Sequence, residues 1–183
     1  MTSTASPNGR TKGGRGQGIH CTTRRGMVTG AVLRGARLSA GISEAGLAAA
    51  SGLDEDSIRS WGDGSSSLAS VPLPDVEIVE SALRDAGADP RLVDDLAVAA
   101  WCDLVLLAAI GSGDVTCLLA DPVTSEDAFG DLLTWCLAGR VPTRYSPYAE
   151  AGPLLADSAL AHRAAEILAP FLPLLAAACR LAS

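Results

Sequence analysis

Apolar residues recur at every third or fourth position along most of the chain from Val32 onward, the spacing of one face of an α-helix. In the stretch 74–86, for example, Val76, Val79 and Leu83 would share one face. The pattern predicts helices over residues 32–40, 44–51, 55–61, 74–86, 90–110, 125–138 and 157–169, and a last helix from residue 173. The predicted fold class is therefore all-α.

Residues that begin and end helices stand at these boundaries. Ser43 and Asp54 can each cap a helix N-terminus by accepting a hydrogen bond from a backbone N–H. Gly41 and Gly52 suit helix ends, because glycine adopts positive φ without strain. Two intervals are less defined: 115–120 reads as either helix or strand, and 140–156, with three prolines, predicts an ordered irregular loop.

The pattern divides the chain into three parts. The beginning is mostly Gly, Ser, Thr and Arg, with almost nothing to bury, so residues 1–30 are predicted to be a disordered basic tail. Residues 31–88 are predicted to form a domain of four or five helices, and residues 89–183 a helical C-terminal domain.

Composition supports a helical protein. Hydrophobic residues make up 48% of the chain and aromatic residues only 4%, and the apolar content is mostly Ala, Leu and Val. These residues suit helix packing better than a β-sandwich. Thirteen arginines against one lysine, with abundant alanine, are typical of a high-GC genome such as an actinobacterial one.

The net charge of −7 is unevenly distributed. Residues 1–30 carry five bases and no acid, whereas the remaining residues carry nine bases and 21 acids. A basic tail on an acidic body is either a nucleic-acid-binding arm or a solvated segment without a role, and both interpretations stay open.

The cysteines and the apolar stretches indicate a cytoplasmic protein without a membrane span. The five cysteines include no CxxC pair, which argues against a disulfide framework or a zinc site, so we predict no metal or other cofactor. The longest apolar stretch, Leu96 to Ile110, has 15 residues and contains Asp103, which is short for a bilayer span. We interpret it as a buried helix.

Residues 44–63 resemble the helix-turn-helix of the Xre/Cro-like family of bacterial and phage repressors. Counted from Glu44, the matching positions are the fourth, fifth, ninth, tenth, fifteenth and eighteenth: Leu47, Ala48, Gly52, Leu53, Ile58 and Trp61. A small alanine lets the two helices cross closely, and the turn needs a residue that tolerates positive φ. The resemblance extends over about residues 31–88.

The resemblance implies sequence-specific binding of double-stranded DNA, with the second helix of the unit in the major groove. The positions facing the groove would be Asp54, Glu55, Asp56, Arg59 and Ser60. Glu44 would lie near phosphate, and Arg34 and Arg37 would add favourable charge. The implied function is transcription regulation at an operator, by a homodimer.

The charge of the unit departs from the family. Asp54, Glu55 and Asp56 place three acids where phosphates would approach, and residues 31–64 carry three bases against five acids. The alternative hypothesis is a helix-turn-helix that serves as a protein–protein interaction module without direct DNA binding.

No catalytic motif stands out, and we do not expect an enzyme. Asp94-Asp95, Asp103 and Glu126-Asp127 are interpreted as acids on solvated faces or at helix starts. The Trp101-Cys102 and Trp135-Cys136 dipeptides are interpreted as core residues where two helices meet, with a tryptophan-lined ligand pocket as the alternative. The apolar stretches 96–110 and 164–182 are expected to bury surface against a second copy of the chain.

Overall fold

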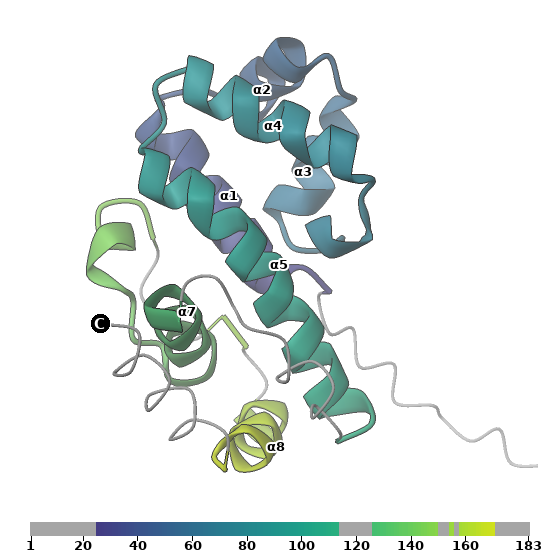
Figure 1. The fold of residues 1–183 in the computed structure, drawn as a ribbon, viewed down its shortest axis with the longest axis vertical. Coiled ribbons are helices and arrows are strands. Elements are labelled where there is room, and N and C mark those ends of the chain that lie inside the picture. The colour runs from purple at the N-terminus through teal and green to yellow at the C-terminus, as the bar shows by residue number, and fades with distance from the viewer. Residues whose placement is uncertain (1–24, 114–125, 150–153, 156–157, 171–183) are drawn as a thin grey trace, which may run out of the picture.

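The structure is a computed structural model that describes residues 25–113, 126–149, 154–155 and 158–170. These residues form seven α-helices and two short 3-10 helices, with no strand among them, so the all-α prediction is confirmed for this part of the chain (Figure 1). The helices are α1 (Met27–Ser39), α2 (Glu44–Ser51), α3 (Glu55–Gly62), α4 (Leu73–Asp85), α5 (Pro90–Gly111), α7 (Glu126–Ala138) and α8 (Ser158–Leu168).

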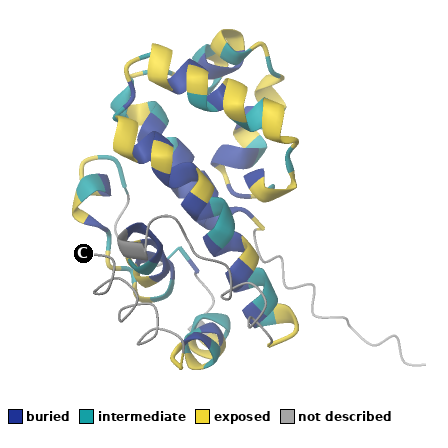
Figure 2. Ribbon diagram, viewed as in Figure 1, coloured by how far each residue is buried: buried dark blue, intermediate teal, exposed yellow. Residues whose placement is uncertain are grey.

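Helix α5 forms the centre of the molecule. Figure 1 shows α1 along one side of it, α2, α3 and α4 grouped at one end, and α7 and α8 against its other side. Because α5 has neighbours on several sides, buried positions recur around it, and Figure 2 shows them along most of its length. One cluster of buried residues runs from Val28 on α1 through Leu96 and Val105 on α5 to Leu132 on α7 and Leu168 on α8.

Local signals account for most helix boundaries. Gly41, Gly52 and Gly87 have positive φ angles of 68°, 69° and 83° and follow the ends of three helices. The Ser43 hydroxyl accepts from Gly46 N–H and the Asp54 carboxylate from Ser57 N–H, both at 3.0 Å. These two caps confirm the predicted starts of α2 and α3.

The start of α1 was placed incorrectly by the sequence pattern. The pattern predicts a helix from Val32 and a disordered tail up to residue 30, yet α1 begins at Met27 and its first four residues are buried. A Cβ on Gly30 would lie 2.7 Å from the carbonyl oxygen of Trp61, so glycine lets this end of α1 approach the end of α3. The early start depends on this tertiary contact between α1 and α3, which the apolar repeat of one helix cannot predict.

The core prediction for the Trp-Cys dipeptides is confirmed for three of its residues. Cys102 on α5 and Trp135 and Cys136 on α7 are buried, and both cysteines are free thiols. Trp101 is partly buried against the same core. The predicted irregular loop contains a 3-10 turn, Thr143–Tyr145, whose tyrosine is fully buried.

Several predictions lie outside the described residues: the tail up to residue 24, the stretch 115–120, part of the loop 140–156, and the helix from residue 173. Among the helices that are described, none combines the length and the apolar character that a membrane crossing requires.

Candidate functional site

The candidate site is built on α2, α3 and the turn between them. Ser51 ends α2, Gly52 turns the chain with a φ of 69°, and Asp54 caps α3 two residues later. Leu47 and Ala48 of α2 and Ile58 and Trp61 of α3 are buried. The inner faces of both helices are thereby fixed in the core, and the outer face of α3 is left to solvent.

The outer face of α3 carries most of the predicted site residues. Asp54, Glu55, Asp56 and Arg59 are exposed. Ser60 is partly exposed, and its hydroxyl donates to the Ser57 carbonyl at 2.9 Å. The structure therefore brings together the five residues that the sequence assigned to groove contacts.

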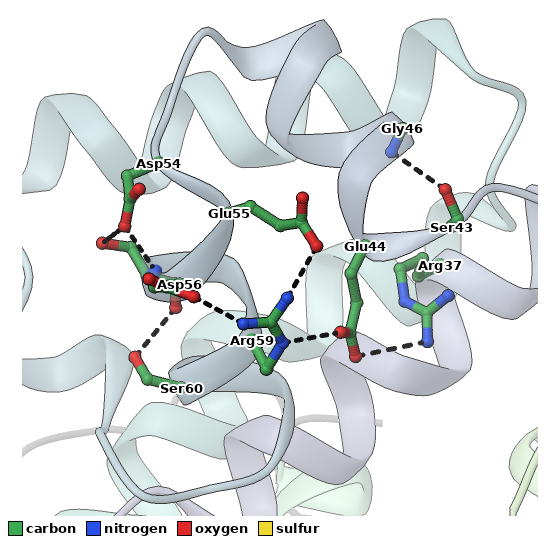
Figure 3. A network of polar contacts seen from close by, with 10 residues as sticks. Arg37, Ser43, Glu44, Gly46, Asp54, Glu55, Asp56, Arg59 and Ser60 are labelled. Atoms are coloured by element: carbon green, nitrogen blue, oxygen red, sulfur yellow. Dashed lines mark hydrogen bonds and ion pairs between the residues drawn. The ribbon is translucent and has the colours of Figure 1, made fainter.

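Arg59 is surrounded by carboxylates (Figure 3). Its Nη1 lies 2.5 Å from Asp56 Oδ1 and its Nη2 2.6 Å from Glu55 Oε1. Its Nε lies 3.7 Å from Glu44 Oε2, across the crossing of α2 and α3. Attraction to Asp56 and Glu55 raises the pKa of the guanidinium above its usual range. Arg59, the one basic residue of α3, therefore already forms ion pairs with acidic residues of the same surface.

Arg34 and Arg37 brace α1 against this unit. Arg34 Nη1 donates to the carbonyl of Gly62, the last residue of α3. Arg37 Nη1 donates to the Ile42 carbonyl at 2.8 Å, and its Nη2 lies 3.8 Å from Glu44. Both side chains are only partly exposed. Each already donates to a backbone carbonyl of the protein, so a contact with a partner would come in addition to this one.

The surface formed by these residues is net negative. The guanidiniums of Arg37 and Arg59 pair with the carboxylates of Glu44, Glu55 and Asp56 (Figure 3). Asp54 adds a fourth carboxylate at the start of α3, where it accepts from Ser57. Over residues 25–88 the sequence has five arginines, no lysine and nine acidic residues. Considered without the rest of the chain, residues 25–88 would therefore repel a polyanion that approaches α3.

Two acidic residues of α5 lie in the core, contrary to the prediction from the sequence. Asp95 and Asp103 were interpreted as solvated, but both lie buried on α5. Asp95 Oδ2 accepts from Arg144 Nε at 2.6 Å and from the Tyr145 hydroxyl at 2.9 Å. Each acid falls within the apolar stripe of α5 rather than opposite it, which is the signal that could have revealed their burial.

Asp103 is a second anchor on α5. Its carboxylate accepts from the backbone N–H groups of Val28 and Thr29 at 2.9 and 3.1 Å, at the beginning of α1. Helix N-termini have unpaired N–H groups, and Gly26, at the cap position of α1, offers no side chain to accept them. An acid from a distant helix therefore supplies the cap.

The aromatic residues of the C-terminal part pack around Tyr145. The Trp135 and Tyr145 rings lie 5.2 Å apart, and the Arg144 guanidinium lies 5.4 Å from the Tyr145 ring centre. A Cβ on Gly35 would lie 3.1 Å from the tyrosine ring, so this turn also contacts α1. Tyr145 thereby joins α1, α5 and α7 at one point.

Nothing in the described ranges groups three His, Cys, Asp or Glu side chains as metal ligands. Comparison with models of protein families, with curated proteins and with solved structures gives no match for this chain.

Proposed function

We propose that this chain is a transcription regulator that binds double-stranded DNA through α2 and α3, in the manner of the Xre/Cro-like family that residues 31–88 resemble. The observation that carries the proposal is the arrangement of α3. Its inner face is buried through Ile58 and Trp61, and its outer face presents Glu55, Asp56 and Arg59 to solvent. In this family the exposed second helix is the one that reads the major groove.

Arg59 is the residue proposed to read a base. Its side chain is 49% exposed, and exposed ion pairs are weak enough to be exchanged for other contacts. On binding, its guanidinium would leave Glu55 and Asp56 and donate two hydrogen bonds to guanine O6 and N7. The released carboxylates could accept from cytosine N4.

The phosphate contacts of this proposal come from bases outside α3. Arg34 and Arg37 border the unit, and residues 1–25 contribute Arg10, Lys12, Arg15, Arg24 and Arg25. These charges would offset the acids of α3 and make the affinity strongly dependent on salt. A homodimer, reading two half-sites, is part of the same proposal.

The test is a binding titration with duplex DNA at several salt concentrations. One duplex is the promoter fragment upstream of the gene that encodes this chain, and the other has a random sequence. We expect Arg59→Ala to weaken binding to the promoter fragment by roughly ten- to a hundredfold and to reduce its preference over random duplex. Arg84→Ala is the matched control. Arg84 is 45% exposed and pairs with Glu80 at an i,i+4 spacing, but it lies on α4. Absence of binding by the full chain even at low salt would contradict the proposal.

A second candidate function is a protein–protein interaction module, and the ion pairs of Arg59 favour it. With Arg59 bound by Glu44, Glu55 and Asp56, the outer face of α3 suits a basic protein partner better than a polyanion. In the same titration this function gives no duplex binding by either the wild type or the variants. It also makes Asp56→Lys weaken the partner complex, whereas DNA binding would gain from the added base.

A further inference from the structure

The solvent-facing side of α5 carries no charge over most of its length. Between residues 97 and 113 the sequence contains one charged residue, Asp103, and that residue is buried. Every exposed or half-buried position of this stretch therefore holds an uncharged residue, and Figure 2 shows such positions between the buried ones along this part of α5. Protein surfaces carry charged residues at about a quarter to a third of their positions, so an uncharged helix face of this length indicates a contact surface.

Four residues of this side follow the spacing of a contact between two helices. Trp101, Leu104, Ala108 and Gly111 are three, four and three residues apart, which is the repeat along the seam of a helix pair. Leu104 is 37% exposed and Gly111 is exposed, whereas Trp101 and Ala108 are partly buried against the core. The α5 seam, as we call these four residues, thus has two large side chains followed by two small ones.

This order makes the α5 seam complementary to itself. In an antiparallel pair of α5 helices, with the two-fold axis between Leu104 and Ala108, Trp101 would lie opposite Gly111 of the partner subunit. Leu104 would lie opposite Ala108 of the partner subunit. Each large side chain then faces a small one, as close packing requires, whereas a parallel pair would place Trp101 against its own copy. No charge of this stretch of α5 would lose its hydration in such a contact.

We propose that the chain forms a homodimer through an antiparallel contact between the α5 seams of two copies. The contact is two-fold, so the same residues of both copies take part in it. Because α2, α3 and α4 are grouped at one end of α5 (Figure 1), the pairing places these groups at opposite ends of the helix pair. The inference rests on the homodimer of the proposed function and assigns its surface, and it does not depend on whether α3 binds DNA.

Sedimentation equilibrium of the full chain tests the contact. The α5 seam spans about 15 Å of helix, which makes a small interface, so we expect self-association with a Kd in the micromolar range. Leu104→Arg would place two like charges beside the two-fold axis and should raise this Kd at least about tenfold. Leu73→Arg is the matched control, because Leu73 lies on α4 and is 68% exposed, and it should associate as the wild type does.

Two results of this experiment overturn the proposal. The first is a wild-type chain that stays monomeric at several hundred micromolar, which would leave the uncharged side of α5 to a partner other than a second copy. The second is an equal Kd for Leu104→Arg and Leu73→Arg, which would place any dimer contact elsewhere.

A second variant tests the antiparallel arrangement and covers the case in which Leu104→Arg does not fold. A Cβ on Gly111 meets nothing within 4 Å, so the monomer should tolerate Gly111→Leu. In the proposed pair the new side chain would collide with Trp101 of the partner subunit, and we expect the Kd to rise at least about tenfold. The control is Gly130→Leu on α7, where a Cβ is equally unobstructed, and its Kd should match that of the wild type. An unchanged or tighter association of Gly111→Leu overturns the proposal, because added apolar surface would then not interfere with the contact.

The same samples separate this inference from the proposed function. A dimer that does not bind duplex DNA at low salt contradicts the proposed function and leaves the α5 contact in place. Duplex binding by a chain that stays monomeric overturns the α5 contact and leaves DNA binding in place.

Discussion

Helices α3 and α5 both carry carboxylates, but they use them in opposite ways. On α3, Glu55 and Asp56 lie in solvent around Arg59. On α5, Asp95 and Asp103 lie inside the core and bind groups from elsewhere in the chain. Exposed pairs contribute little to stability and are easily exchanged, whereas buried groups are costly to leave unpaired. The charged groups on the outer face of α3 are therefore free to exchange contacts, whereas the acids of α5 hold the fold together.

The largest effect is expected on the inner face of α3. Trp61→Ala removes a side chain that is 7% exposed, and truncation of a buried tryptophan costs about 3–5 kcal/mol of unfolding free energy. Urea denaturation of the variant measures it. Leu73→Ala on α4 is the control, because that leucine is 68% exposed and its truncation should change the midpoint little. Equal midpoints for both variants would mean that Trp61 is not part of the core.

The next effect concerns the anchor at Asp95. Asp95→Ala leaves the Arg144 guanidinium and the Tyr145 hydroxyl without their acceptor, and we expect a loss of about 3 kcal/mol. Asp131→Ala removes the other acid that binds Arg144, but Asp131 is exposed, so its loss should cost less than about 1 kcal/mol. If both substitutions cost the same in a denaturant titration, the distinction between buried and exposed carboxylates fails for this pair.

A smaller effect is expected where α1 approaches α3. Gly30→Ala places a methyl group 2.7 Å from a backbone carbonyl oxygen, and such overpacking costs about 1–3 kcal/mol. The control is Gly130→Ala in the middle of α7, where a Cβ meets nothing within 4 Å. There alanine should stabilise the helix by about 0.5–1 kcal/mol. Thermal melts that shift in the same direction for both variants would contradict the close contact.

The sequence predicts this fold where the signal is local. The helix pairs around Gly41, Gly52 and Gly87 were predicted because a cap, an apolar repeat and a glycine stand within a few residues of one another. The start of α1 was not, because its cap comes from Asp103, 74 residues away from Thr29. No window of sequence contains both partners.

In the candidate site, too, the local contacts could be predicted from the sequence and the long-range contacts could not. The pairing of Arg59 with Glu55 and Asp56 follows from their spacing of four and three residues on one helix. The contribution of Glu44 does not, because it depends on how α2 crosses α3. The burial of Asp95 and Asp103 could be inferred from the apolar stripe of α5, in which both lie. Their partners on α1 and in the 3-10 turn could not, because these are distant in the sequence.

The smallest effect on stability, and the sharpest on function, is expected from neutralising the outer face of α3. In the double variant Glu55→Gln, Asp56→Asn, the cap residue Asp54 stays in place, so α3 should keep its N-terminus and the denaturation midpoint should remain close to that of the wild type. The guanidinium of Arg59 loses both carboxylates at once.

If α3 meets DNA, affinity for duplex at low salt should rise, because two repulsive charges are gone and Arg59 is released from its pairs. If α3 meets a basic protein, affinity for that partner should fall and duplex binding should stay absent. The control is Glu77→Gln, Asp85→Asn on α4, which changes the net charge equally at two other exposed positions. A rise in duplex affinity of the same size in both double variants would assign the effect to net charge and not to α3.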